Sequence, residues 1–124
     1  MGIIRQASHR AVFLDRDGVI NQAIVRDGKP YAPTRLADVI LLPYVANALD
    51  ELKSAGFQLI VVTNQPDVAR GKVEKADIEE IHTHLKNTLP LDAVYCCYHD
   101  DADGCACRKP KPGFLHEAAA TYGL

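Results

Sequence analysis

Short apolar segments that end in polar turns constrain the fold of this chain more than any other feature. The segments AVFL, at residues 11–14, and FQLIVV, at residues 57–62, have the length and composition of buried β-strands. A third segment, at residues 93–98, has the same character. The first two lead directly into the polar sequences DRDG and TNQ, so polar groups are expected where these strands end.

Stretches with helical spacing of apolar residues separate or follow the strands. Pro43 suits the first turn of a helix that Gly56 would end, and further helices are expected at residues 74–89 and 112–122. Residues 21–35, rich in glycine and proline, are interpreted as an irregular loop. Strands that alternate with helices predict an α/β fold with a parallel sheet, in which functional groups gather at the carboxyl ends of the strands.

Length and charge exclude several classes of protein. The 124 residues are expected to form a single domain, 1–124, and the net charge of −2 leaves no basic face for nucleic acid. No apolar run approaches the roughly 20 residues that span a bilayer, so no membrane partner is expected. Residues 1–10 lack the apolar stretch of a secretory signal, which favours a cytoplasmic location.

A pair of aspartates follows the strand at residues 11–14. Asp15 and Asp17 are two residues apart, so on an extended backbone their side chains point the same way. Converging carboxylates repel each other unless a cation lies between them, and oxygen ligands of this kind suit Mg²⁺. One carboxylate could attack phosphorus while its neighbour handles the proton, and Gly18 allows the sharp turn that follows. For this motif alone, a solvated turn is the competing interpretation.

The four cysteines all lie in the loop 96–107, too close together for a disulfide framework. The pattern CxH…CxC predicts a closed tetrahedral zinc site with the ligands Cys97, His99, Cys105 and Cys107. Cys96 is interpreted as a small buried strand residue, although a swap of Cys96 for Cys97 as ligand stays open. The other histidines fit no ligand spacing and are expected on the surface or on a helix face: His9, His82, His84 and His116.

These motifs resemble those of the haloacid dehalogenase superfamily of phosphohydrolases. FLDRDGVIN is similar to its first motif, and VVTNQ to its second, in which a hydroxyl at a strand end, here Thr63, binds the phosphoryl group. CRKPKPGF resembles its third, whose lysine, here Lys109, neutralises charge on the nucleophile and the phosphate. The resemblance implies a Rossmann-like three-layer α/β/α core without a cap domain. It also implies a phosphatase in which Asp15 is the nucleophile and Asp17 the acid and base.

The zinc pattern narrows the resemblance to a branch that contains heptose bisphosphate and histidinol-phosphate phosphatases. The resemblance implies that Arg108 contacts the substrate, whereas for Arg108 alone a solvated arginine is the competing interpretation. Asn64 and Gln65 would line the same mouth or only close the turn. Arg70 either reaches a distal substrate group or caps its loop. A phosphorylated small molecule, most simply a heptose bisphosphate, is the expected partner, with histidinol phosphate as the alternative.

The chain departs from the family pattern near its carboxyl end. The fourth motif of the family, an acidic pair that supplies a further Mg²⁺ ligand, would follow the last helix, and no such pair occurs before Leu124. Absence of the accompanying strands would leave residues 11–14 at an exposed sheet edge, which predicts self-association. Three hypotheses compete. The first is a phosphatase that acts on a sugar bisphosphate through an aspartyl-phosphate, in a chain that is either truncated or has lost the fourth motif. The second is a catalytically impaired, zinc-stabilised remnant that binds phosphorylated metabolites or a partner. A phosphoacceptor signalling domain is ranked last.

Overall fold

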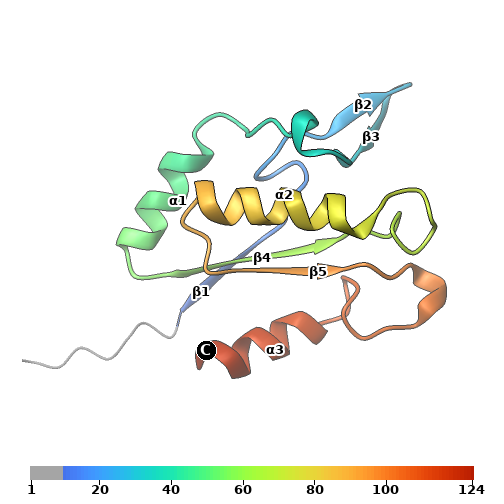
Figure 1. The fold of residues 1–124 in the computed structure, drawn as a ribbon. Coiled ribbons are helices and arrows are strands. Elements are labelled where there is room, and N and C mark those ends of the chain that lie inside the picture. The colour runs from blue at the N-terminus through green and yellow to red at the C-terminus, as the bar shows by residue number, and fades with distance from the viewer. Residues whose placement is uncertain (1–9) are drawn as a thin grey trace, which may run out of the picture.

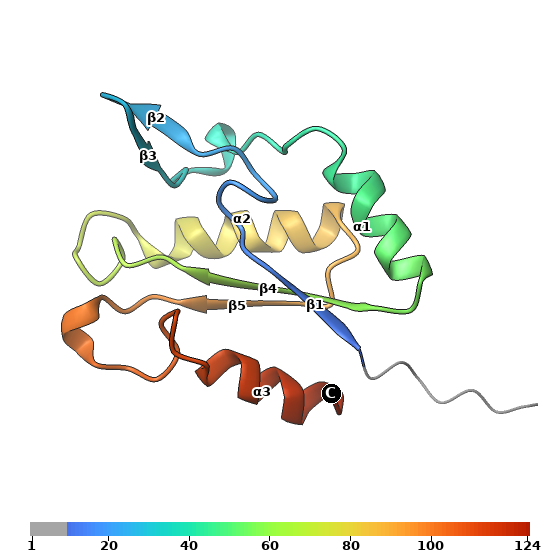
Figure 2. The same ribbon diagram turned by 180° about the vertical axis from the view of Figure 1, so that it is seen from behind.

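A parallel sheet forms the centre of the molecule in a computed structural model that describes residues 10–124 (Figure 1). Its strands, in the spatial order β1-β4-β5, are β1 (Ala11–Leu14), β4 (Gln58–Asn64) and β5 (Ala93–Cys97). Helices lie on both faces, with α1 and α2 on one side and α3 on the other (Figures 1 and 2). Their bounds are α1 (Val45–Ser54), α2 (Lys75–Thr88) and α3 (Gly113–Tyr122). This three-layer α/β/α arrangement confirms the predicted fold class.

The two faces of β4 explain its continuous apolar sequence. Leu59 and Val61 belong to the buried core beneath α1 and α2, whereas Ile60 and Val62 pack on the opposite face with Ala118 of α3. A strand covered on both faces needs apolar residues at every position, because neither set of side chains reaches water. β4 is therefore the central element around which the layers assemble.

β1 differs from the prediction in its burial. The strand has the expected bounds, but it is only half-buried, and the Phe13 side chain is 38% exposed. The cause is its place in the sheet, because β1 pairs with β4 on one side and forms an edge of the three-stranded sheet on the other. The edge position itself agrees with the sequence-based expectation. β4 also runs further than predicted, through Thr63 and Asn64.

The interpretation of residues 21–35 as an irregular loop is wrong. Part of this segment forms an antiparallel hairpin of β2 (Ile24–Arg26) and β3 (Lys29–Tyr31). Asp27 and Gly28 make its turn with positive φ angles of 50° and 74°. Two-residue turns of this hand match the twist of the paired strands, and an Asp-Gly sequence is a strong signal for them.

The helices follow the predicted pattern closely. α2 and α3 each begin one residue later than expected, and α1 begins at Val45, after Pro43, and ends just before Gly56, whose φ is 94°. No helix within residues 10–124 is long and apolar enough to cross a membrane. The expectations for His9 and for the rest of the amino-terminal segment 1–9 lie outside the described residues.

The parallel register brings the predicted motifs to one edge of the sheet. Leu14 at the end of β1 is paired with Val61, and on the other side of β4 Thr63 is paired with Cys96 and Asn64 with Cys97. The carboxyl ends of all three strands therefore point in one direction (Figure 1). The loops that follow them carry the polar groups of the candidate site.

Candidate active site and metal-binding cluster

Asp15 lies directly after β1 and is open to solvent. Its side chain is 61% exposed, and its carboxylate forms an ion pair with the Lys109 ammonium group. Lys109 Nζ also donates to the Val62 carbonyl oxygen at 2.7 Å, so the lysine is anchored on the central strand. The predicted nucleophile and the predicted charge-neutralising lysine are thus brought together, although 94 residues separate them in the chain.

Asp17 occupies a different environment from Asp15. Its Oδ1 accepts hydrogen bonds from Arg16 Nε at 2.9 Å, from Arg16 Nη2 at 2.7 Å and from Asn21 Nδ2 at 3.1 Å. Its Oδ2 accepts one, from Gln65 Nε2 at 2.9 Å. These donors hold the carboxylate in a single orientation and leave lone-pair capacity on Oδ2, which has fewer partners.

The turn after the aspartates is built by backbone groups. Gly18 has a φ of 84°, a conformation that glycine adopts without strain, as its place in the motif predicts. The amides of Ile20 and Asn21 donate to the Arg16 carbonyl oxygen at 2.8 and 3.2 Å, and the Gly18 amide donates to the Asn21 carbonyl at 2.8 Å. The tight turn directs Asn21 back toward Asp17.

Thr63 and Gln65 connect the second motif to the first. Thr63 is buried at the end of β4, and its Oγ1 accepts a hydrogen bond from Gln65 Nε2 at 3.0 Å. Because a hydroxyl can accept and donate at once, the Thr63 proton stays available for a phosphoryl oxygen. Gln65, predicted either to line the substrate mouth or to close the turn, donates from its amide nitrogen to Asp17 and Thr63, and its contact with substrate stays a prediction.

Asn64 supports the segment that carries the lysine. Its Nδ2 donates to the Lys109 carbonyl oxygen at 3.2 Å, and its Oδ1 accepts from the Lys109 backbone amide at 3.0 Å. Both polar groups of the Asn64 side chain therefore have protein partners. The arrangement fixes the backbone from which the lysine side chain reaches Asp15.

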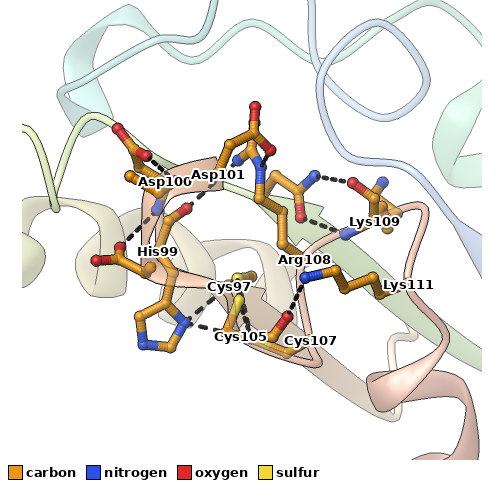
Figure 3. Close-up of polar contacts among 12 residues, drawn as sticks. Cys97, His99, Asp100, Asp101, Cys105, Cys107, Arg108, Lys109 and Lys111 are labelled. Atoms are coloured by element: carbon orange, nitrogen blue, oxygen red, sulfur yellow. Dashed lines mark hydrogen bonds and ion pairs between the residues drawn. The ribbon is translucent and has the colours of Figure 1, made fainter.

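The cysteine and histidine residues converge beyond the end of β5 (Figure 3). Their ligand atoms all lie within 4.8 Å of one another, in a group formed by Cys97, His99, Cys105 and Cys107. The sulfur of Cys105 is 3.6 Å from those of Cys97 and Cys107, and His99 Nδ1 lies 3.6 Å from the Cys97 sulfur. Tetrahedral ligands at Zn–S distances of about 2.3 Å would be roughly 3.8 Å apart, which is close to these separations. The Cys97 and Cys107 sulfurs are only 2.9 Å apart, so these two side chains would have to separate when a metal binds. The donor types, three thiols and one imidazole, are those of a closed zinc site.

The protonation of the thiols reflects this crowding. Burial, together with the neighbouring sulfurs of Cys97 and Cys105, raises the pKa of Cys107 to about 12. Desolvation opposes ionisation of Cys105, but hydrogen bonds from the Arg108 backbone and from the other two thiols lower its pKa to about 6. A cation would relieve this repulsion and favour the thiolate form of all three cysteines.

Cys96 does not join the cluster. It is partly buried and packs against the core beneath α1 and α2, and burial raises its pKa to about 12. The geometry therefore favours Cys97 over Cys96 as a ligand. The expectation that Cys96 is a buried strand residue holds in part, since its side chain is not fully enclosed.

The loop between the ligand pairs has its own local order. Asp100 Oδ1 accepts from the Ala102 amide at 2.7 Å, and Asp103 Oδ2 accepts from the Asp100 amide at 2.8 Å, which forms a capping box over a short 3₁₀ turn. Gly113, at the start of α3, approaches Ala106 so closely that a Cβ there would collide with its carbonyl group. The ligand loop is thus packed against the third helix.

Comparison with known proteins places this arrangement in a family. A family model described as polynucleotide kinase 3 phosphatase matches residues 15–123, from the first aspartate almost to the end of the chain. The chain belongs to this family. The matched region contains both the aspartate site and the cysteine and histidine cluster, and its fold is the haloacid dehalogenase-like fold expected from the motifs.

Relatives that are similar in sequence to this chain have names that specify a substrate. The chain is 37% identical to a D-glycero-beta-D-manno-heptose-1,7-bisphosphate 7-phosphatase of Pseudomonas aeruginosa, across 94% of the chain and 66% of that protein. It is equally identical, at 37%, to the alpha-anomer enzyme of Mycobacterium tuberculosis, across 91% of the chain and 60% of the relative. The chain therefore spans less than two thirds of the length of these relatives.

Solved structures agree with the family assignment. The D,D-heptose 1,7-bisphosphate phosphatase of Bordetella bronchiseptica, complexed with magnesium and phosphate, superposes with a TM-score of 0.79 at 34% identity. That match covers 93% of this chain and 64% of the other. A haloacid dehalogenase-like phosphatase from Mesorhizobium loti gives a TM-score of 0.77 at 28% identity, over 100% of this chain and 62% of the other.

Arg108 and Arg70, the two arginines predicted to bind substrate, form ion pairs with aspartates in or near the ligand loop. Arg108 Nε donates to Asp101 Oδ1 at 2.7 Å and its Nη1 to the His99 carbonyl oxygen at 3.3 Å (Figure 3). Arg70 Nε contacts Asp100 Oδ2 at 3.2 Å, and its Nη1 contacts Asp67 Oδ1 at 3.4 Å. Arg70 is predicted either to reach a distal substrate group or to cap its loop; the Asp67 contact lies within that loop, and the Asp100 contact joins it to the ligand loop.

Small cavities lie on both sides of Lys109. One of about 130 Å³ is lined by Asp15, Lys109, Val62 and neighbouring apolar residues, and one of about 120 Å³ is lined by Arg108, Lys109 and the ligand loop. A larger cavity of about 480 Å³ lies away from Asp15, beside α2 and β5. Lys109 lines both small cavities, of which one contains Asp15 and the other Arg108.

Sequence reasoning missed some of the residues that form the site. Arg16 and Asn21 are fully buried and both bind Asp17. His82 was expected on the surface or a helix face, and the surface part of that expectation is wrong because its side chain is 7% exposed and contacts Arg16. Helical spacing contained the signal, since His82 lies four residues after Ile78 and three before Leu85 on the apolar face of α2. His84 and His116 are exposed, as predicted.

Proposed function

We propose that this chain is a phosphatase domain that hydrolyses a phosphomonoester of a small metabolite through an aspartyl-phosphate on Asp15. The observation that carries the proposal is the ion pair between Lys109 and the solvent-open carboxylate of Asp15, with Lys109 also anchored on the central strand. A nucleophile open to substrate beside a fixed cation is what phosphoryl transfer requires, because catalysis there depends on positioning and charge stabilisation.

The reaction would proceed in two displacements at phosphorus. First, an Asp15 oxygen attacks phosphorus, and the bond between phosphorus and the leaving oxygen breaks. Asp17 supplies a proton to the leaving oxygen from Oδ2, which among the described residues accepts a hydrogen bond from Gln65 only. Asp17 then takes a proton from water, which attacks phosphorus and releases phosphate and the free Asp15 carboxylate. Thr63 donates its hydroxyl proton to a phosphoryl oxygen, and Lys109 offsets the negative charge.

Asp15, through its carboxylate, and Asp17, through its backbone carbonyl, are the residues proposed to hold Mg²⁺, which leaves the Asp17 carboxyl group for proton transfer. Bound Mg²⁺ would offset negative charge between the nucleophile and the phosphoryl oxygens. The Bordetella structure, which contains magnesium and phosphate, supports this assignment. Oxygen ligands suit the ion, but among residues 10–124 no third acidic or histidine side chain joins the two aspartates.

A heptose 1,7-bisphosphate is the proposed substrate, with histidinol phosphate as the alternative. The names of the Pseudomonas and Mycobacterium relatives support a heptose bisphosphate. One name specifies the beta anomer and the other the alpha anomer, and this chain is 37% identical to both proteins. In this proposal Arg108 binds a phosphate or sugar oxygen of the substrate with its planar guanidinium. Asn64, Gln65 and Arg70 hold the surrounding loops. Their contacts to protein groups support this indirect role.

The cysteine and histidine cluster is proposed to hold a structural Zn²⁺. The donor set supports this, because three sulfurs and one imidazole nitrogen leave no open position for chemistry. Zinc would fix the loop that ends in Arg108 and Lys109. A cytoplasmic location is part of the same proposal, since free thiols persist in a reducing compartment.

The catalytically impaired, metabolite-binding form is retained as a second candidate because one observation favours it. A hard cation needs several anionic oxygens to offset its dehydration, and the described residues offer Asp15 and Asp17 only. In this case the domain would bind phosphorylated metabolites without efficient turnover. Binding without phosphate release distinguishes it from the first candidate.

Phosphate release from both anomers of heptose 1,7-bisphosphate, with Mg²⁺ present, tests the proposed function. We expect release by the wild-type chain, its loss in Asp15→Asn, and its retention in Asp50→Asn, an exposed carboxylate on α1 that serves as the matched control. Absence of release from a folded, zinc-loaded wild type, together with measurable binding of the bisphosphate, would favour the impaired form.

We also propose that the edge of β1 that is unpaired among residues 10–124 pairs with a second copy of the chain. Support comes from the edge position of β1 and from the partly exposed Phe13. Light scattering across a concentration series should then show a mass that rises toward that of a dimer. A constant monomer mass at the concentrations used for activity would contradict this proposal.

A further inference from the structure

Arg16 is an unusual residue to find inside the protein. It lies between the two motif aspartates, yet its side chain is 0% exposed. Burial of a guanidinium is costly unless its charge is paired and its N–H groups are hydrogen-bonded. The partners of Arg16 therefore show what the burial achieves.

The guanidinium has two groups of partners on opposite sides. Nε and Nη2 donate to the same Asp17 oxygen, at 2.9 and 2.7 Å. Nη1 lies 3.0 Å from His82 Nε2 in the middle of α2, 66 residues away in the chain. Among the hydrogen-bond partners of Arg16 and Asp17 in the described chain, His82 is the one that a helix supplies.

The chemistry of this contact determines the state of the imidazole. An arginine has hydrogen-bond donors only, so His82 Nε2 must act as the acceptor. The imidazole is then neutral and carries its proton on Nδ1. A protonated His82 would face the guanidinium with two donors and two positive charges, and the contact could not form.

The surroundings of His82 favour the same state. Burial, with the positive charge of Arg16, lowers the pKa of His82 to about 4, and the opposing effect of Asp17 is smaller. Beside it, Cys96 from β5 and Tyr98, which follows that strand, line the adjoining cavity with Glu79 and Lys86 from α2 itself. The raised pKa values of Cys96 and Tyr98, caused first by burial, keep both groups uncharged near neutral pH.

We propose that His82 is a positioning residue for the aspartate site, whose neutral imidazole accepts a hydrogen bond from Arg16 and so fixes the guanidinium that orients Asp17. The inference rests on the proposed function for its catalytic consequence, although the contact itself does not. His82 touches neither Asp15 nor the cavities beside Lys109, so its effect is transmitted through Arg16. Such second-layer contacts fix the direction of the groups that act on the substrate.

Nuclear magnetic resonance of the folded chain tests the contact without turnover. We expect the Nδ1–H tautomer of His82 at neutral pH and a slowly exchanging Arg16 Nε–H. His82→Leu removes the acceptor and should shift the Asp17 carboxyl ¹³C resonance and speed the Arg16 exchange. His82→Gln, whose side-chain oxygen can accept, should restore both toward wild type. An Nε2–H tautomer, or an unchanged Asp17 resonance in His82→Leu, would overturn the proposal.

Kinetics with the heptose bisphosphate test the consequence for catalysis. In His82→Leu we expect kcat to fall about 10- to 100-fold with KM changed less than about threefold, because orientation of the acid is lost while substrate contacts remain. His82→Gln should recover most of the loss, and exposed His84→Gln on the same helix should match wild type. Equal kcat in wild type and His82→Leu would overturn the positioning role. No turnover in wild type, with the resonances as expected, would refute the proposed function and leave the His82 contact established.

Discussion

The cysteine and histidine cluster and the aspartate site occupy neighbouring loops but are assembled in different ways. The outermost cluster ligands are 10 residues apart, and a capped turn between them brings the halves together. The aspartate site joins residues separated by 48, 66 and 94 positions, in the pairs Asp17–Gln65, Arg16–His82 and Asp15–Lys109. Local ligands need little loop closure, whereas the aspartate site exists only when the strands are in register.

The two regions meet at Lys109. This lysine follows Cys107 by two residues and is held at Asp15 from one side and by Asn64 from the other. The cluster ligand Cys107 is therefore close in sequence to the backbone from which Lys109 reaches its remote partner Asp15. Variants of the cluster and of Lys109, measured for both stability and activity, therefore test how the two regions depend on each other.

Loss of a cluster ligand is expected to have the largest effect. Cys97→Ser should abolish stoichiometric zinc binding and the cooperative thermal transition, because structural zinc contributes on the order of 10 kcal/mol of folding free energy. Metal analysis and calorimetry provide the measurement. Cys96→Ser, one residue earlier but outside the cluster, should keep the zinc and lose far less stability. A zinc-free Cys97→Ser chain that melts like wild type would show the cluster to be dispensable.

Replacement of the junction lysine should affect activity but not the fold. We expect Lys109→Met to lower kcat about 100- to 1,000-fold, because one preorganised positive group opposite the developing charge is lost. Zinc content and melting temperature should stay near wild type, since the aliphatic part of the side chain is kept. Lys111→Met, an exposed neighbour whose ammonium contacts the Cys105 carbonyl, is the control. Similar losses in both variants would place the effect in the loop and not in the charge.

The buried histidine predicts a pH dependence of stability. Its pKa is about 4 in the folded chain and 6.5 when exposed, so between these values the unfolded chain binds more protons. Stability should therefore be complete above pH 6.5 and fall as the pH drops toward 4, by on the order of 3 kcal/mol. Urea unfolding of wild type and His82→Gln across this range measures the difference, in which the zinc and carboxylate contributions cancel. Parallel curves would contradict the neutral buried state.

The Asn64 contacts should give the smallest effect. Asn64→Ala removes two hydrogen bonds to the Lys109 backbone and should cost about 1–2 kcal/mol of unfolding free energy. Activity should fall more than in Asn87→Ala, an exposed position on α2. Asn64→Asp, which keeps the acceptor for the Lys109 amide, should lie between the two. Unchanged stability in Asn64→Ala would indicate that the cluster alone holds the lysine segment.

Residues with local signals could be predicted, and residues with remote partners could not. The cluster ligands are predicted by their spacing, and Asp15 by an aspartate pair at the end of an apolar segment. Lys109 is predicted only by the resemblance of CRKPKPGF to a family motif. The inward direction of Arg16 depends on a histidine of α2, so no window around the first motif reveals it. The hairpin turn at Asp27 and Gly28 did have a local signal, but the proline at position 30 obscured it. That residue fits because, among residues 10–124, β3 pairs with β2 alone.

The most direct test of the proposed chemistry is identification of the covalent intermediate. The folded, zinc-loaded chain would be mixed with Mg²⁺ and heptose 1,7-bisphosphate, quenched in acid during turnover, and reduced with borohydride, which converts an aspartyl-phosphate to homoserine. Peptide mass spectrometry should then find homoserine at position 15, and none in the Asp15→Asn variant. Phosphate release without any modified residue at position 15, or with the modification at position 17, would contradict Asp15 as the nucleophile.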